Sequence, residues 1–320
     1  MTELIDVLPG IELPVGAVSQ ELSKMWEGNN ETALSEFRAS QMNLVLHFGR
    51  TVSPNDAKAR FEVAVRFAQR YPSRIIVLCP FTEKNQPMQA KLFSQCFIGD
   101  SHREMCCCEA LILGFSSEDN GFLFNQVSVW LESDLPIYHW FSEVRPERVV
   151  KYFDYLLKRV HRIVFDSNIE SYAIRDLPWP NPKKVVDLAR ARLLPIRQAI
   201  GQYLSGIPFD LLSKNLRLVT VCSALNQKGD AFHLMQWLEH CLKCDVDESV
   251  ESKLSELEPN SNQRLSLEIE YLDGRFIKWV QFEDSSISHL RHNFDGAVKE
   301  LSMQIKPMLP EQELSEAFYF

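Results

Sequence analysis

The stretch that decides the fold class runs from Met42-Asn-Leu-Val-Leu-His-Phe48 through Ser53-Pro54 to Arg74-Ile-Ile-Val-Leu-Cys79. The first segment is interpreted as a strand, and the last is a continuous apolar run, typical of a parallel strand buried on both faces. Between them, Ser53 and Pro54 have the pattern of a helix N-cap followed by proline at the first helical position. Strand, helix and buried strand form a βαβ unit, which predicts an α/β fold.

The residues that follow extend this unit into a first α/β domain over residues 1–175. Two strands are expected near 89–98 and 106–115 as a hairpin, and a last strand ends at Asp166-Ser167. The domain is expected to be Rossmann-like but without a glycine-rich nucleotide loop. Only 12 of the 320 residues are glycine, and no two of them form a G-x-G arrangement. Such loops need glycine because the backbone must approach phosphate closely, so no nucleotide cofactor is expected.

The segment Leu177-Pro-Trp-Pro-Asn-Pro182 holds three prolines in five residues and is incompatible with a helix or a central strand. Residues 176–186 are therefore predicted to be a proline-rich linker. A connecting helix and a second α/β domain with a mixed sheet should follow over residues 187–320. Its expected parts are a strand at 216–222, a helix at 230–242, an acidic loop at 245–263, a hairpin around Asp273-Gly274, a strand near 287–292 and a helix at 311–320.

Composition restricts the classes of function. The chain is 45% hydrophobic and 24% charged with a net charge of −9, which is ordinary for a globular protein and argues against nucleic acid as the main partner. The N-terminus lacks the pattern of a signal peptide, and no apolar run approaches the length of about 20 residues that spans a bilayer. The sequence therefore predicts a soluble cytoplasmic protein without a membrane partner.

Three arginines stand close together in the stretch that begins at Asp187, namely Arg190, Arg192 and Arg197. Read as a helix, the stretch has an apolar stripe, and Pro195 should kink or restart it. One interpretation is a connecting helix whose arginines are solvated or paired with carboxylates. The other is a docking element for a partner, together with Trp179 in the preceding segment.

Cys106-Cys107-Cys108 is the most unusual local feature of the chain. Small thiols suit a tightly packed strand, which is the simpler interpretation. Neighbouring cysteines do not readily bond to each other, so a thiol switch in this cluster would need a distant partner such as Cys96 or Cys79. Cys96, His102 and Cys106 do not follow a known zinc spacing and lack an apparent fourth ligand, and Cys241-x-x-Cys244 lies at the end of a helix rather than its start. No metal site is predicted.

No local signature of a hydrolase or a metalloprotease is present, and no residue set identifies a catalyst. Asp166 and Ser167 follow a strand at the position where α/β proteins place ligand-binding groups. The simpler interpretation is that these two residues cap the turn after the strand. The residues alone therefore predict a two-domain α/β protein and do not predict an activity.

Six segments in order resemble the glucose-6-phosphate dehydrogenase assembly proteins, the OpcA family. They are Arg38-Ala-Ser-Gln-Met-Asn-Leu-Val, Tyr71-Pro-Ser-Arg-Ile-Ile-Val, Cys108-Glu109 before Ala-Leu-Ile-Leu, Asp134-Leu-Pro-Ile-Tyr-His-Trp-Phe, Arg162-Ile-Val-Phe-Asp-Ser and Asp187-Leu-Ala-Arg-Ala-Arg-Leu-Leu-Pro-Ile-Arg. The resemblance covers roughly residues 36–205. Two positions depart from the family pattern, because Arg190 and Phe141 stand where the family has tryptophan.

The resemblance implies a non-catalytic protein that binds glucose-6-phosphate dehydrogenase, promotes its active oligomer and raises its activity. It would thereby support the oxidative pentose phosphate pathway and the supply of NADPH. It also implies redox control in some members, which would involve the candidate cysteines Cys96, Cys106, Cys107 and Cys108. Two alternatives remain open. One is a sugar-phosphate-binding protein with its site near Asp166 and Ser167, and the other is a thiol redox sensor.

Overall fold

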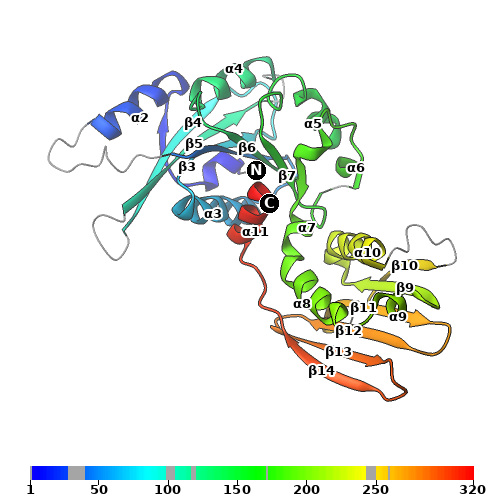
Figure 1. The fold of residues 1–320 in the computed structure, drawn as a ribbon. Helices are drawn as coiled ribbons and strands as arrows, with labels where there is room; N and C mark the ends of the chain where they lie inside the picture. Colours follow the sequence, from blue (N-terminus) through cyan, green and yellow to red (C-terminus); the bar gives the residue numbers. More distant parts are fainter. Residues whose placement is uncertain are drawn as a thin grey trace. The chain divides into compact units, whose positions relative to one another are not determined.

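The computed structural model describes residues 2–27, 40–98, 105–116, 120–170, 172–242, 250–258 and 260–320. The chain divides into two compact units, whose elements are labelled in Figure 1. The first unit comprises Met1–Phe165, Glu170–Val186 and Pro310–Phe320. The second comprises Asp166–Ile169 and Asp187–Leu309.

The described strands of the first unit form an 8-stranded sheet in the order β1-β4-β5-β3-β2-β6-β7-β8. The five neighbours β5, β3, β2, β6 and β7 are parallel. Taken in chain order they have the 3-2-1-4-5 arrangement of a Rossmann sheet, which confirms the predicted α/β class. The strands are β1 (Ile11–Leu13), β2 (Met42–Phe48), β3 (Ser73–Pro80), β4 (Gln89–Ile98), β5 (Met105–Phe115), β6 (Ile137–Ser142), β7 (Arg162–Phe165) and β8 (Val185–Asp187).

The β2–α3–β3 unit formed as its sequence indicated. Every residue of β2 and of β3 is buried, as expected for central parallel strands covered on both faces. Helix α3 (Pro54–Arg70) begins where Ser53 accepts a hydrogen bond from the backbone N–H of Asp56, at 3.1 Å. The helix ends at Tyr71, directly before Pro72. On the other side of β5, β4 pairs antiparallel with it, which confirms the predicted hairpin.

Helices cover both faces of this sheet (Figure 1). On one face, α2, α4 and α5 contribute to a core cluster that includes Leu22, Val127 and Val149. On the other face, α3 packs against β2, β3 and β5, and α1 and α11 pack against α3. The helices are α1 (Leu4–Val7), α2 (Val18–Glu27), α4 (Asn120–Trp130), α5 (Pro146–Tyr152), α6 (Tyr172–Arg175) and α11 (Pro310–Tyr319), with short 3-10 turns at Val15–Ala17 and Pro182–Lys184.

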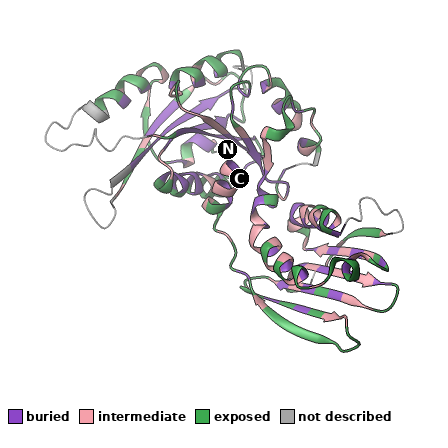
Figure 2. Cartoon of the chain, viewed as in Figure 1, coloured by how far each residue is buried: buried purple, intermediate pink, exposed green. Residues whose placement is uncertain are grey.

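The second unit has a mixed 6-stranded sheet in the order β10-β9-β11-β12-β13-β14 among its described residues. Strand β10 is parallel to β9, and the other pairs are antiparallel. Helices α8 and α10 share a core cluster with the sheet, in which Trp279 and Leu234 are fully buried. Figure 2 shows the change from buried residues near this core to exposed residues along β14. The elements are α7 (Leu188–Arg192), α8 (Leu194–Ser205), α9 (Phe209–Ser213), β9 (Leu216–Ser223), a 3-10 turn at Leu225–Gln227, α10 (Lys228–Leu242), β10 (Glu251–Glu256), β11 (Gln263–Tyr271), β12 (Phe276–Phe282), β13 (Ile287–Asn293) and β14 (Lys299–Gln304).

The structure differs from the expected domain division at two places. Residues 176–186, expected to be a linker, belong to the first unit, where Trp179 is buried in the core cluster. The terminal helix α11, expected in the second domain, also belongs to the first unit because its apolar side packs against α3. In both cases the segment belongs to the unit against which its side chains pack, and its position in the chain did not indicate that unit.

The acidic stretch 245–263 also differs from its prediction as a loop. Residues 251–256 form β10, and residues 243–249 and 259 lie outside the described part of the chain. All but one of the residues of β10 are exposed, so the strand lacks the alternation that would have indicated it. Strand β14 was likewise missed. The Asp273-Gly274 hairpin is confirmed, with Gly274 at a φ of +84° between β11 and β12.

Within the described residues, no helix combines the length and apolar character that crossing a bilayer requires.

Candidate functional site

Asp187 begins the arginine-containing segment as the N-cap of α7. One of its carboxylate oxygens accepts hydrogen bonds from the backbone N–H groups of Ala189 and Ser167, at 3.0 and 3.1 Å. The other lies 2.8 Å from Nε2 of His233. Burial by itself would raise the pKa of this carboxyl, but the hydrogen bond and charge of His233 and the hydrogen bonds from Ser167 outweigh it and lower the pKa. Asp187 therefore fixes the start of α7 and joins it to α10.

The two helices α7 and α8 meet at Leu193, and Pro195 lies in the first turn of α8. A proline has no backbone N–H to donate, and it is tolerated in a first turn because those N–H groups have no partner within the helix. The predicted restart of the helix at Pro195 is confirmed. Leu193, Ile196 and Ile200 belong to the core cluster of the second unit.

Arg192 lies at the centre of an ion-pair network within the second unit. Its guanidinium contacts Oδ2 of Asp166 at 2.5 Å and Oδ1 of Asp230 at 3.0 Å. Arg264 contacts the other oxygen of Asp230 at 3.3 Å. Burial raises the pKa of Asp230, and the charges of Arg192 and Arg264 oppose that effect. The guanidinium of Arg192 is thus bound to two buried carboxylates, as the interpretation of paired arginines expects.

Asn168 completes this network between the turn after β7 and the start of α10. Its side-chain oxygen accepts from the backbone N–H of Gly229 at 2.8 Å, and its amide donates to Asp230 at 2.9 Å. The two segments of the chain approach closely here. A Cβ on Gly229 would lie only 2.0 Å from Oγ of Ser167. Asp166 also accepts from the backbone N–H of Asn168 at 3.0 Å, as the turn-capping interpretation of Asp166 and Ser167 expects.

The other predicted partner-binding residues differ in exposure. Arg190 is exposed, and Arg197 is partly buried and donates to the backbone oxygen of Arg190 at 3.2 Å. Trp179 is buried, with its Nε1 donating to the backbone oxygen of Ile174 at 3.1 Å and its ring 5.2 Å from that of Phe153. Of the residues proposed to contact a partner, Arg190 is therefore the one with a freely accessible side chain. That role stays a prediction.

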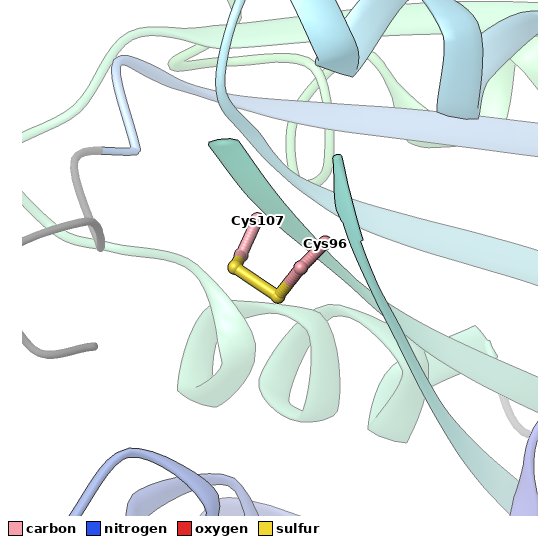
Figure 3. The surroundings of a disulfide bond; sticks show 2 residues. All are labelled: Cys96 and Cys107. Atoms are coloured by element: carbon pink, nitrogen blue, oxygen red, sulfur yellow. A yellow bond between two sulfur atoms is a disulfide. The ribbon is translucent and has the colours of Figure 1, made fainter. Parts of the chain in front are cut away.

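Two of the four candidate redox cysteines are joined in the structure. Cys96 in β4 and Cys107 in β5 face each other across the hairpin and form a disulfide (Figure 3). Cys96 is exposed, whereas Cys107 is buried. Of the two distant cysteines considered as partners for Cys106-Cys107-Cys108, namely Cys96 and Cys79, the one that forms the disulfide is therefore Cys96. In this state its sulfur is not available to a zinc ion.

The remaining cysteines divide by burial. Cys108 and Cys79 are buried and lie outside the disulfide, and burial raises the pKa of Cys79, opposed in part by Lys91. Such a thiol is unreactive, because the thiolate is the nucleophile. The side chain of Cys106, and His102 and Cys244, lie outside the described residues. No group of three or more potential metal ligands occurs in the described part of the chain.

Sequence reasoning missed exposed apolar side chains on α4 and in the segment after α5. We call this set of side chains the α4 surface. Its members, with their exposed fractions, are Phe122 (70%), Phe124 (37%), Val129 (67%) and Tyr155 (63%). The rings of Phe124 and Tyr155 lie 6.4 Å apart beside a groove of about 530 Å³. Phe124 and Tyr155 adjoin each other, whereas Phe122 and Val129, seven residues apart, share a different face of α4. Exposed apolar side chains that gather on a surface mark interaction sites. The sequence Phe122-Leu-Phe-Asn-Gln-Val-Ser-Val129 could have indicated this exposure. Its apolar residues occupy more than one face of the helix, whereas packing against the sheet buries a single apolar stripe.

Residues 64–178 match the family model described as the glucose-6-phosphate dehydrogenase subunit N-terminal domain, of OpcA type. This part of the chain is similar to the OpcA family. An OpcA-family protein from Synechocystis, named putative OxPP cycle protein OpcA, is 31% identical over 146 residues. A protein of the same name from Synechococcus elongatus is 31% identical over 103 residues.

The OpcA match covers part of each protein. It includes 44% of this chain and 30% of the Synechocystis protein, and 32% of this chain and 23% of the Synechococcus protein. The chain thus spans less than a third of the length of these curated relatives. The α4 surface lies within the matched residues, and Arg190 lies beyond them.

Solved structures resemble this chain only distantly. An aldose-aldose oxidoreductase from Caulobacter crescentus, complexed with glycerol, has 9% identity and a TM-score of 0.40 over 87% of both chains. A structure titled trehalose-6-phosphate from E. coli, bound with UDP-2-fluoro glucose, has 13% identity and a TM-score of 0.25 over 61% of this chain and 43% of the other. At these scores the likeness carries no information about function.

Proposed function

We propose that this protein is a non-catalytic partner of glucose-6-phosphate dehydrogenase that promotes assembly of the active enzyme and raises its activity. The observation that carries the proposal is the match of residues 64–178 to the OpcA family, whose description names that dehydrogenase. In this role the protein would act in the cytoplasm and support the oxidative pentose phosphate pathway and the supply of NADPH.

The α4 surface supports binding of a folded protein. Aromatic side chains at the centre of a contact supply most of the binding energy at protein interfaces. Phe122 and Tyr155 are aromatic and more than half exposed, and a groove lies beside Phe124. The position of this surface within the family-matched segment fits a function that the family shares. We therefore propose that the α4 surface contacts the dehydrogenase.

The first experiment is co-purification of the protein with the glucose-6-phosphate dehydrogenase of its host, followed by assay of that enzyme with and without the protein. The proposal expects a complex and a higher dehydrogenase activity. The proposal would be refuted if the two proteins did not co-purify and the dehydrogenase activity were the same with and without this protein. Turnover by the pure protein alone would refute its non-catalytic character.

The contact surface is tested with the double variant Phe122→Ser and Val129→Ser. Because both side chains are exposed, the variant should fold normally yet need at least roughly tenfold more protein for the same activation. Leu272→Ser is the matched control, since Leu272 is 72% exposed in the second unit. Equal activation by the double variant and the control would place the contact elsewhere.

Arg190 is the second proposed contact, in the segment that begins at Asp187. Reversal of its charge in Arg190→Glu should weaken activation without a change in circular dichroism, because the side chain is exposed. Full activation by this variant would remove the segment from the proposed interface.

The disulfide favours a second candidate function, a thiol redox sensor. A dithiol reductant would transfer two electrons and two protons to the Cys96–Cys107 bond, which yields two thiols while the reductant becomes a disulfide. Cys96 is the exposed sulfur and thus the accessible point of attack. This function predicts that reduction changes dehydrogenase activation or oligomeric state and that Cys96→Ser removes the change. Cys241→Ser, at an exposed free cysteine, is the control. Identical behaviour of the oxidised and reduced protein would refute it.

A further inference from the structure

A hollow of about 120 Å³ lies at the carboxyl ends of the parallel strands in the first unit. Phe48, Pro80 and Phe115, the last residues of β2, β3 and β5, line it, together with Val144 after β6. The chain leaves β2 and β6 in opposite directions across the sheet, so this is the topological switch point, where open α/β sheets bind ligands. We call it the switch-point hollow.

Three arginines line the switch-point hollow, and no carboxylate is among its described lining residues. Arg50 comes from the loop after β2, and Arg145 and Arg148 come from the segment after β6. The side chains of Arg50 and Arg145 are exposed, and neither forms an ion pair with a described residue. In a chain of net charge −9, a concave site with only positive side chains attracts anions.

The inner wall of the hollow carries no charge of its own. His47 is fully buried and burial lowers its pKa to about 3, so its imidazole is neutral at physiological pH. Burial raises the pKa of Tyr152, and the charges of Arg148 and then Arg50 lower it, so both guanidinium groups act on the same phenol. The positive charge of the site therefore comes from the arginines at its rim.

The size and backbone of the hollow restrict the anion that it accepts. Its volume is well below the range of roughly 300–1,000 Å³ that encloses larger ligands, so a dinucleotide does not fit. The loop after β2 is Gly49-Arg50-Thr51-Val52 and lacks the glycine-rich pattern that cradles a pyrophosphate. Gly49 is instead required for the approach of two backbones, because a Cβ there would lie 1.6 Å from the carbonyl oxygen of Glu143.

We propose that the switch-point hollow binds one phosphate group, either as inorganic phosphate or as the phosphate of a small monoester. The guanidinium groups of Arg50 and Arg145 would hold it, since the planar fork of arginine matches phosphate oxygens in a bidentate arrangement. Asp166 and Ser167 are not among its lining residues, and their polar groups serve the Arg192 and Asp187 contacts. It does not depend on the proposed binding of a dehydrogenase.

Isothermal titration calorimetry of the purified full chain tests the site directly. The probes are inorganic phosphate, glucose 6-phosphate, unphosphorylated glucose and NADP⁺, all at one constant ionic strength. The proposal expects binding of the first two probes and none of glucose. No binding of either phosphate probe at roughly 10 mM would overturn it. Tighter binding of NADP⁺ than of glucose 6-phosphate would overturn the argument from size.

The double variant Arg50→Gln and Arg145→Gln assigns the binding to this hollow. Loss of two charge-assisted contacts should weaken phosphate binding by roughly a hundredfold, and the fold should be unaffected because both side chains are exposed. Arg159→Gln is the matched control, since Arg159 is an exposed arginine that lines a different hollow of the same unit. Equal affinity of the double variant and the control would show that phosphate binds elsewhere and would overturn the proposal. Because the assay uses the isolated chain, its result is independent of whether the protein activates a dehydrogenase.

Discussion

Single residues of the second unit show how buried charges are held. The carboxylate of Asp230 is 2% exposed, and it is tolerated in the core because two arginines and the Asn168 amide surround it. Arg192 also contacts Asp166, so one guanidinium serves two carboxylates. Removing Arg192 would leave both partners buried with less compensation.

Arg192→Gln is therefore expected to destabilise the protein by about 3–5 kcal/mol, the usual cost of breaking a buried ion pair from one side. Arg190→Gln, two residues away and exposed, should change stability by less than about 0.5 kcal/mol. Urea unfolding of both variants, followed by circular dichroism, measures the difference. If the two substitutions had the same effect, the network would contribute nothing to stability. A docking test should accordingly use Arg190 and not Arg192.

His47 and His139 make stability depend on pH. Their ring nitrogens lie 3.2 Å apart between β2 and β6. Burial lowers the pKa of His47 to about 3, and burial together with the charge of His47 lowers the pKa of His139. Above the ordinary histidine pKa of 6.5 both residues are neutral in the folded and the unfolded chain. As the pH falls below that value, only the unfolded chain takes up protons, so stability is lost.

The free energy of unfolding should therefore fall with pH below about 6.5, by about 1.4 kcal/mol per pH unit for each histidine. His47→Gln should remove one part of this slope, while His289→Gln, at an exposed residue, should leave it unchanged. Urea midpoints between pH 7 and pH 5 measure the slopes. Parallel curves for wild type and His47→Gln would contradict the prediction.

At the scale of elements, the turn after β2 depends on a close approach of two backbones. The N–H of Gly49 donates to the carbonyl oxygen of Ser142 at 2.7 Å, which joins the end of β2 to the end of β6. Glu143, the next residue, has a φ of +58°, a conformation that few residues other than glycine adopt. The absence of a Cβ at Gly49 is what allows this junction to form.

Gly49→Ala should consequently lower stability by more than about 4 kcal/mol, because its Cβ would overlap backbone atoms that have no room to move. Gly121→Ala is the matched control, since a Cβ there meets no atom within 4 Å. In helix α4 that change should be neutral or stabilise by up to about 1 kcal/mol. Thermal unfolding distinguishes the two, and similar melting temperatures would show that the β2–α3 turn relaxes freely.

At the scale of the whole molecule, residues from opposite ends of the chain complete one unit. The ring of Phe318 in α11 lies 5.5 Å from that of Phe67 in α3, and Tyr319 lies 4.9 Å from Tyr71. Arg162 also donates to the backbone oxygen of Ala317 at 3.1 Å. The helix thus covers a part of the first unit that α3 leaves open.

Deletion of residues 310–320 should destabilise the first unit by roughly 3–6 kcal/mol, the value of burying side chains such as Leu314 and Phe318. Hydrogen exchange should show lost protection in α3 and unchanged protection in α10, which belongs to the second unit. Phe320→Ser is the control, because Phe320 is 85% exposed. Loss of protection in α10 with α3 unchanged would contradict the assignment of α11.

Much of the fold was predictable because it depends on residues that are neighbours in the chain. Ser53-Pro54 set the start of α3, and Asp273-Gly274 set the β11–β12 turn. The apolar run 74–79 indicated a central strand because its burial on both faces requires apolar residues throughout. Strand β10 was missed because an exposed edge strand is free to be polar, and its charges resembled those of a loop.

Less of the candidate site was predictable. The sequence by itself determined the α/β class, the β2–α3–β3 unit, the Asp273-Gly274 hairpin and the restart at Pro195. Only the tertiary structure decided that Arg192 bridges Asp166 and Asp230, that Cys107 bonds to Cys96, and that Arg50 and Arg145 line the same hollow. The physical reason is range. Periodicity and capping act over a few residues, whereas strand register and loop convergence join residues tens of positions apart, through contacts that no local pattern encodes.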